Sequence, residues 1–375
     1  MRTILTIFGT RPEAIKIAPV VQRAQAMGAR ILTCTTGQHK EMLAQVLELF
    51  EIKPDFELQV MRPNQDLTSL TSRILDGVAD VLRLSSPDIV LVQGDTTTAF
   101  ASALAAFYAK IQVGHIEAGL RTYNLHSPFP EEAMRQMISR IASWHFAPTE
   151  RNVRALVSEN IPREQIIQTK NTVIDALFQV SSQVRTGSKA EHMEIPVSIL
   201  EKLNDERQII LITKHRRENF GRAIEGICEA FHDLANKFPD ILFLYPVHMN
   251  PNVSMPVERI LGSLPNFKLL KPVNYYSFVY LMGRSHLIIT DSGGVQEEAP
   301  SLRRPVFVTR ETTERVEIVE AGAVKLVGTD ASVIVRDVSR ALENESVYKS
   351  MLIDSNPYGD GNSAQRILDC LYRES

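Results

Sequence analysis

The chain of 375 residues has only three cysteines and no excess of positive charge. Cys34, Cys228 and Cys370 lie far apart, which excludes a CxxC metal or redox motif and argues against a disulfide framework. With 41 basic and 44 acidic residues the formal net charge is -3, so the general basic surface of a nucleic-acid-binding protein is missing. We therefore expect no nucleic-acid partner, and any phosphate-bearing ligand must be held by a local cluster of residues.

Targeting, membrane, cofactor and metal signals are missing as well. No run approaches the roughly 18 apolar residues of a membrane helix, so no membrane partner is expected. Residues 1–8 carry one Arg and no small-residue cleavage site, which predicts a first strand, not a signal peptide, and favours the cytoplasm. No GxGxxG or P-loop is present, which argues against a dinucleotide cofactor or an ATP-dependent kinase. No metal is expected, because six histidines show no HxxxH or HxxE pairing: His39, His126, His192, His232, His248 and His286.

The composition is that of a folded enzyme, with 44% hydrophobic and 23% charged residues. A chain of this length favours two domains. Short β-branched runs alternate with helical patterns, which predicts an α/β fold with parallel sheets. The predicted strands form two series and hence two doubly wound, Rossmann-like domains. The first series is 3–8, 30–36, 88–93, 112–116, 145–147 and 166–169, and the second is 208–213, 241–246, 267–270, 287–290, 305–308 and 324–327.

Polar residues follow the predicted strands of the first half, at the sheet edge where α/β proteins bind ligands. Arg11 and Lys16 flank a helix start, whose free N–H groups and dipole favour an anion. An ordinary strand-to-helix turn with solvated bases remains an alternative. Three carboxylates come next along the chain, those of Asp95, Glu117 and Glu131. Taken alone, Asp95 would be explained as a helix N-cap. Converging carboxylates have at least one raised pKa, which suits proton transfer near neutral pH.

The second half contains two candidate phosphate-binding segments. Residues 214–218 place His215 and several bases after a strand, which suits a clamp for a diphosphate. A solvated basic helix start explains that segment equally well. The Ser-Gly-Gly turn at 292–294 is more specific, because its bare backbone N–H groups suit phosphate oxygens. Glu298, one turn into the next helix, is positioned to accept both ribose hydroxyls.

Taken together, these segments resemble the non-hydrolysing UDP-N-acetylglucosamine 2-epimerases. The resemblance runs in order from Met1 to about Leu371, so it covers nearly the whole chain. Eight segments carry it: residues 8–14, 94–97, 115–122, 130–132, 215–218, 291–299, 312–315 and 356–361.

The resemblance implies a GT-B architecture of two Rossmann-like domains, in which the last helix crosses back onto the first domain. We expect residues 1–170 with helix 362–375 to carry the acid/base carboxylates, and residues 171–361 to bind UDP. The boundary itself is placed near 170–172. The implied reaction is the reversible conversion of UDP-GlcNAc to UDP-ManNAc at C2. It proceeds by anti-elimination of UDP through 2-acetamidoglucal and re-addition, without metal or nicotinamide.

Residue roles follow from the resemblance position by position. Asp95, Glu117 and Glu131 would be the acid/base carboxylates, and His215 would lie near the diphosphate. UDP would be held by Arg11, Lys16, Ser292, Gly293, Gly294, Glu298 and Arg315. Some bacterial relatives bind a second, allosteric UDP-GlcNAc, which corresponds here to Gln38, His39 and Arg217. Relatives are commonly homodimers, so a homodimer is expected.

Five positions depart from the family pattern. Lys214 and Lys170 stand where Gly is usual, and Lys replaces a glycine of positive φ only at a cost of about 1–2 kcal/mol. Met134, Val273 and Val316 replace Asn, Gln and Pro. Two alternatives therefore stay open, namely a GT-B glycosyltransferase or other NDP-sugar enzyme, and a non-catalytic nucleotide-sugar sensor. Neither needs the three carboxylates of the first half.

Overall fold

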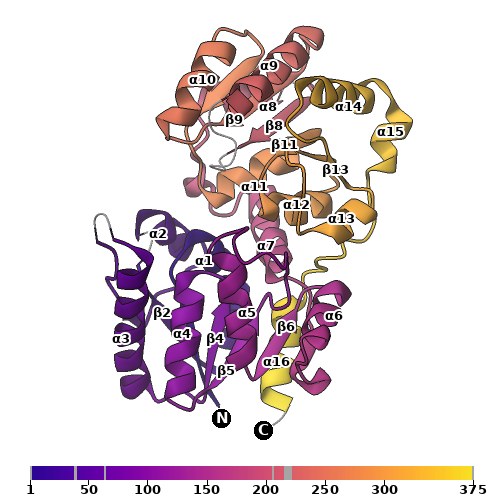
Figure 1. Ribbon diagram of the computed structural model, residues 1–375. Helices are drawn as coiled ribbons and strands as arrows, with labels where there is room; N and C mark the ends of the chain where they lie inside the picture. The colour runs from indigo at the N-terminus through magenta and orange to yellow at the C-terminus, as the bar shows by residue number, and fades with distance from the viewer. Residues whose placement is uncertain (1, 38–39, 63–64, 205–206, 215–221, 374–375) are drawn as a thin grey trace. The chain divides into compact units, whose positions relative to one another are not determined.

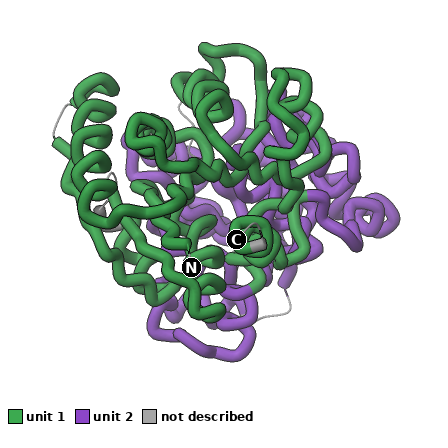
Figure 2. Tube along the Cα trace, turned by 90° about the horizontal axis from the view of Figure 1, so that it is seen from below, with its two compact units in different colours: residues 1–178, 358–375 green, residues 179–357 purple. Residues whose placement is uncertain are grey.

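The computed structural model describes residues 2–37, 40–62, 65–204, 207–214 and 222–373. The chain forms two compact units, one of residues 1–178 and 358–375 and one of residues 179–357 (Figure 2). The first unit ends inside helix α7 (Thr172–Thr186), eight residues after the boundary expected at 170. Within the described residues, no helix is both long enough and apolar enough to span a bilayer.

The first unit contains a seven-stranded parallel sheet in the order β3-β2-β1-β4-β5-β6-β7. Strands β1 and β4 are buried along their whole length, as expected when helices cover both faces of a parallel sheet. The chain runs outward from β1 and returns to β4, so the strand order reverses between these two. The strands are β1 (Thr3–Phe8), β2 (Arg30–Thr35), β3 (Phe56–Glu57), β4 (Ile89–Gln93), β5 (Gln112–Ile116), β6 (Trp144–Ala147) and β7 (Ile166–Gln168).

Helices cover the first sheet in two rows, α3, α4 and α5 in one and α2, α1 and α16 in the other (Figure 1). Helix α16 packs on α1, and Ile367, Leu368 and Leu371 of α16 are completely buried. Both chain ends therefore lie in the first unit. Its helices are α1 (Arg11–Ala26), α2 (Lys40–Leu49), α3 (Leu67–Ser85), α4 (Thr97–Tyr108), α5 (Glu131–Ile141), α6 (Glu150–Ser158), η1 (Arg163–Gln165), the start of α7 and α16 (Ser363–Arg373).

The second unit contains a six-stranded parallel sheet in the order β10-β9-β8-β11-β12-β13. Its strands are β8 (Ile209–Thr213), β9 (Leu242–Pro246), β10 (Phe267–Leu270), β11 (Leu287–Thr290), β12 (Val306–Val308) and β13 (Val324–Leu326). Helix α9 lies between α10 and α14. The helices are η2 (Ala190–His192), α8 (Val197–Asn204), α9 (Arg222–Lys237), α10 (Pro251–Leu261), α11 (Tyr275–Arg284), α12 (Gly293–Glu298), η4 (Ala299–Leu302), α13 (Val316–Glu320), α14 (Ala331–Glu343) and α15 (Glu345–Ser350).

The structure confirms the two doubly wound, Rossmann-like sheets. All twelve predicted strands are present, and no bound differs by more than one residue. Strand β3 was not predicted, because a strand of two residues shows no hydrophobic pattern.

Candidate active site

Asp95 lies in the turn between β4 and α4 of the first unit. Gly94 turns the chain with a φ of 72°, a conformation that favours glycine. Thr96 caps α4, because its Oγ1 accepts a hydrogen bond from the Ala99 N–H at 3.0 Å. Asp95 Oδ2 accepts a hydrogen bond from Arg135 Nη2 at 2.5 Å, and the Asp95 side chain is 26% exposed. The carboxylate is therefore held by a buried guanidinium and still reaches solvent.

Glu117 follows β5, in the neighbouring strand-end turn. Its carboxylate accepts hydrogen bonds from Lys16 Nζ, Gln93 Nε2 and, at 3.4 Å, Asn171 Nδ2. Its Oε2 lies 4.0 Å from where a Cβ on Gly94 would stand, which places it beside the Asp95 turn. Glu117 also adopts a φ of 66°, and strained backbone of this kind is concentrated at functional sites. Lys16, predicted to bind UDP, is thus an ion-pair partner of Glu117.

Helix α5 carries both Glu131 and Arg135, the residue that binds Asp95. Glu131 is its first residue, and Arg135 lies one turn later. Glu132 is fully buried and accepts hydrogen bonds from the Thr122 and Tyr123 backbone N–H groups, both at 3.0 Å, and from Gln136 and Arg135. Burial alone would raise the pKa of Glu132, but the hydrogen bonds from Gln136 and Thr122 and the Arg135 charge outweigh it and hold the pKa below its usual value.

Glu13 is a structural carboxylate whose role sequence reasoning missed. Its Oε2 accepts hydrogen bonds from the backbone N–H groups of Gly9 and Thr10, at 3.0 and 2.7 Å. Its Oε1 accepts one from Thr96 Oγ1 at 2.5 Å. Glu13 therefore ties the turn that leads into Arg11, the first residue of α1, to the turn that carries Asp95. The Thr-x-x-Glu spacing of a capping box was the available signal.

His115 on β5 contacts the turn that carries Asp95. It is completely buried, and its Nε2 donates to the Gly94 carbonyl at 2.7 Å, while Nδ1 has no hydrogen-bond partner in the described part of the chain. Burial lowers the pKa of His115 to about 3, against the opposing effect of the bond to Gly94. The neutral imidazole is therefore a fixed donor, not a proton-transfer group.

In the second unit, the predicted phosphate-binding turn follows β11. Ser292 precedes α12, and Gly293 and Gly294 form its first turn. A Cβ on Gly293 would stand 2.9 Å from Cζ of Arg315, so only glycine lets this guanidinium approach the turn. Glu298 ends α12 and is buried, and its Oε1 accepts a hydrogen bond from the Tyr275 hydroxyl at 2.5 Å. The turn, Glu298 and Arg315 thus belong to one cluster.

Arg315 is held by two acidic side chains. Its Nε donates to Glu297 Oε1 at 2.9 Å and its Nη1 to Glu314 Oε2 at 3.3 Å. Arg310 contacts Glu314 as well, at 3.2 Å. Burial would raise the pKa of Glu314, but the charges of Arg315 and Arg310 outweigh it and hold that pKa at about 2. The guanidinium is therefore oriented before any ligand binds.

Four predicted site residues, His215, Arg217, Gln38 and His39, lie outside the described residues. Across the described part of the chain, no group of three or more His, Cys, Asp or Glu residues is arranged to hold a metal ion.

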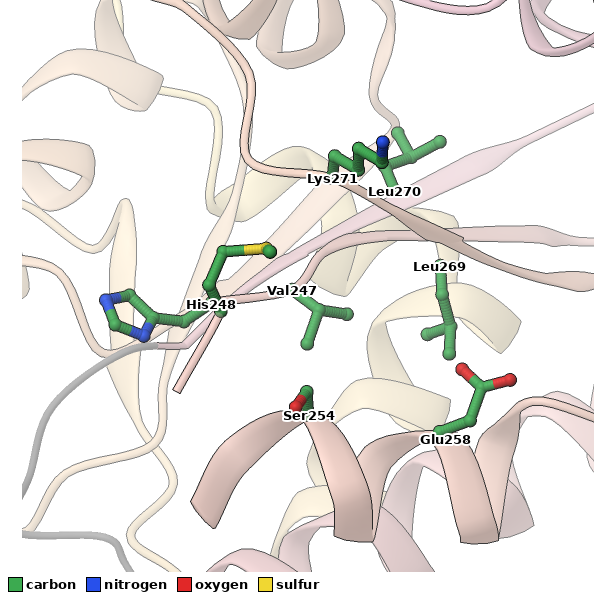
Figure 3. A pocket seen from close by; sticks show the side chains of 8 residues that line it. Val247, His248, Ser254, Glu258, Leu269, Leu270 and Lys271 are labelled. Carbon is green, nitrogen blue, oxygen red and sulfur yellow. The ribbon is translucent and has the colours of Figure 1, made fainter. Parts of the chain in front are cut away.

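A separate pocket of about 260 Å³ lies in the second unit, at the ends of β9 and β10 (Figure 3). Val247 and Leu269 provide apolar surface, and Ser254 and Glu258 point toward them from α10. The pocket shares no residue with the cluster around the 292–294 turn.

Comparisons with known proteins show the family of the chain. A family model described as UDP-N-acetylglucosamine 2-epimerase matches residues 22–372. The chain belongs to the UDP-N-acetylglucosamine 2-epimerase family. It is therefore an isomerase, and the resemblance to the non-hydrolysing epimerases is confirmed.

Individual members of the epimerase family match over nearly their full length. The UDP-N-acetylglucosamine 2-epimerase of Yersinia pestis is 51% identical over 372 residues, which cover 98% of each chain. That of Escherichia coli K12 is 51% identical over 369 residues, again 98% of each. The crystal structure of the Neisseria meningitidis epimerase, bound to UDP-GlcNAc, has a TM-score of 0.93 at 49% identity and covers 99% of this chain and 100% of that one. At 12% identity and a TM-score of 0.61, Acinetobacter baumannii MurG shares the GT-B fold alone.

Proposed function

We propose that this epimerase interconverts UDP-GlcNAc and UDP-ManNAc by eliminating UDP and adding it back. The observation that carries the proposal is the pair of strand-end carboxylates in the first unit, each set against a cation: Asp95 against Arg135 and Glu117 against Lys16. The Neisseria meningitidis relative with bound UDP-GlcNAc supports the choice of substrate.

The chemistry needs two proton-transfer groups. A base removes the C2 proton, and the electron pair forms the C1=C2 double bond as the C1–O bond to the diphosphate breaks. This releases UDP and leaves 2-acetamidoglucal. An acid on the other face returns a proton to C2, and UDP adds back at C1. Asp95, Glu117 and Glu131 are the groups proposed for these steps, because positioned carboxylates contribute about 10²–10⁴-fold to such transfers.

The second unit is proposed to hold the nucleotide. The N–H groups of the 292–294 turn and the guanidinium of Arg315 suit the diphosphate, because backbone donors and an arginine fork bind phosphate oxygens. Glu298, already fixed by Tyr275, suits the ribose hydroxyls. Arg11 and His215 complete the proposed set. No metal or organic cofactor enters the reaction, and we propose a cytoplasmic homodimer.

The decisive experiment follows the sugar C2 position in D₂O. The protein is incubated with UDP-GlcNAc and no added metal, and proton NMR follows the C2 signal and the products. We expect deuterium at C2 and a UDP-ManNAc product. Release of UDP together with 2-acetamidoglucal over long incubation would support elimination, since the intermediate is then lost to solvent. Tight UDP binding without exchange or product would contradict the proposal.

A further inference from the structure

A buried ion pair lies at the centre of the second sheet. Lys214 comes directly after β8 and Asp291 directly after β11, and these strands are neighbours with Thr213 opposite Thr290. The chain runs outward from β8 to β9 and β10 and then returns to β11, so the strand order reverses between β8 and β11. Crevices at such a reversal, outside the carboxyl ends of the strands, are where open α/β sheets bind their ligands.

Contacts from several elements surround Lys214. The residue is 3% exposed, and its Nζ lies 3.9 Å from Asp291 Oδ2 and 3.4 Å from Thr309 Oγ1. Asp291 is completely buried, and the Tyr245 hydroxyl donates to the Lys214 carbonyl at 3.5 Å. A charge in such surroundings is costly unless a counter-charge and hydrogen bonds compensate it. Lys214 and Asp291 therefore depend on each other.

The pair is connected to the turn of the nucleotide site. The Asp291 N–H donates to the Thr213 carbonyl at 3.2 Å, and the Thr213 and Thr290 hydroxyls are 2.6 Å apart. Thr290 Oγ1 also accepts a hydrogen bond from the Ser292 N–H at 3.0 Å. Asp291 is therefore joined to Ser292, the first residue of the turn, both directly along the chain and through the hydrogen bonds of Thr213 and Thr290.

We propose that Lys214 is a positioning residue for nucleotide binding: its ammonium group holds Asp291, and with it the 292–294 turn, in the binding conformation. When Lys214 loses its proton, the charge interaction between Lys214 and Asp291 is lost and the turn is held less firmly. Binding of a nucleoside diphosphate is therefore linked to one proton. This inference rests on the proposed function, in which the 292–294 turn binds UDP.

The surroundings of Lys214 bring the loss of its proton into a pH range in which binding can be measured. Burial lowers the pKa of Lys214 to about 8, although the charge of Asp291 opposes the shift. Within the described residues, two neighbouring groups, Cys228 and Tyr245, do not change their charge in this range. Burial raises the pKa of Cys228 on α9 to about 12 and that of Tyr245 on β9 well above its usual value. Lys214 is then about nine-tenths charged at pH 7 and about one-tenth charged at pH 9.

The test is calorimetric titration of UDP from pH 6.5 to 9.0 at constant ionic strength. Because affinity falls with the competent fraction, the wild-type protein is expected to bind UDP about tenfold more weakly at pH 9 than at pH 7. Lys214→Met keeps the side-chain volume and removes the charge. This variant is expected to bind UDP weakly at pH 7 and to show no tenfold loss of affinity between pH 7 and pH 9. Lys214→Gly, the residue of the family pattern, is the second variant if the first fails to fold. Lys237→Met, on an exposed lysine of α9, is the control and is expected to keep the step.

Buffers of different ionisation enthalpy give an independent readout. At pH 8, wild-type binding is expected to take up about half a proton, so the observed heat differs between Tris and HEPES. Neither Lys214 variant is expected to show that difference. A tenfold step that persists in both variants, or a wild-type affinity that does not change with pH, overturns the inference and leaves the proposed function standing. Failure of the wild-type protein to bind UDP at any pH overturns both.

Discussion

Arg135 binds Asp95 through Nη2 at 2.5 Å and binds Glu132 through Nη1 at 3.1 Å. Glu132 has no exposed side-chain surface, and two backbone N–H groups fix it to the segment after β5. The orientation of Asp95 is thus set by a chain of charge-assisted hydrogen bonds that starts from fixed backbone. Asp95 supplies the carboxylate, and Arg135 and Glu132 of α5 determine its orientation.

Substituting Arg135 should therefore impair catalysis more than nucleotide binding. We expect Arg135→Met to lower kcat by about 10²-fold, the lower end of the contribution of a positioned acid or base. Arg135→Lys should recover part of the loss. Initial rates at saturating UDP-GlcNAc measure kcat, and calorimetric titration with UDP measures nucleotide binding.

Arg140 supplies the control for this experiment, because it lies on the exposed side of α5 and bonds to the Glu159 carbonyl. Arg140→Met is expected to keep the wild-type kcat. UDP affinity should be unchanged in both variants. A loss of UDP affinity in Arg135→Met as large as the loss of kcat would show that the guanidinium supports the fold as a whole and does not specifically position the carboxylate.

Glu298 provides a test on the nucleotide itself. If its carboxylate accepts the ribose hydroxyls, Glu298→Gln should weaken UDP binding by about 1.5–3 kcal/mol, the range for hydrogen bonds to a charged group. The wild-type protein should also distinguish UDP from 2′-deoxy-UDP, and the variant should not. Tyr275→Phe, which removes the hydrogen bond to Glu298 Oε1, should cause a smaller loss. Equal discrimination by wild type and Glu298→Gln would remove Glu298 from the ribose site.

The strands and strand-end motifs could be predicted, because both follow from local patterns. A β-branched run such as 89–92 is buried on both faces, and polar residues directly after it lie at the ligand-binding edge. Which charged side chains pair with each other could not be predicted in this way. Lys16 pairs with Glu117, 101 residues later, and Arg135 with Asp95, 40 residues earlier. These pairings depend on which strands become neighbours, which no local pattern specifies.

The departures from the family pattern have different structural consequences. Met134 is buried in α5, where an apolar side chain adds to the core. Val316 is the first residue of α13, a position that also favours Pro. Lys214 belongs to the buried pair beneath the nucleotide turn. Nothing in the described contacts explains Val273.

Lys170 carries the steric cost that the sequence suggested. Its φ is 66°, which is unfavourable for a side chain with a Cβ. Its ion pair with Asp360, at 4.0 Å, is partly exposed and contributes little to stability. Lys170→Gly should raise the free energy of unfolding of the first unit by about 0.5–1 kcal/mol, after the greater flexibility of glycine in the unfolded chain is deducted. Trp144, the single tryptophan, lies in β6 and reports on this unit in urea titrations. Lys170→Ala keeps the Cβ and should bring no gain. An equal gain in both variants would show that the backbone conformation is not the cause.

His115 should make the stability of the first unit depend on pH. Its pKa is about 3 in the folded protein, because of burial, and about 6.5 in an unfolded chain. Between these values the unfolded state binds more protons, so the stabilising contribution of neutral His115 is complete above about pH 6.5 and is lost as the pH falls.

Below about pH 6, the wild-type free energy of unfolding should fall more steeply than that of His115→Gln, by about 1.4 kcal/mol per pH unit. Urea titrations followed by Trp144 fluorescence at pH 7, 6 and 5 measure these slopes. His126→Gln, on an exposed loop, is the matched control and should keep the wild-type slope. If His115→Gln kept it as well, His115 would have to be charged in the folded protein, and its role as a neutral donor to Gly94 would be wrong.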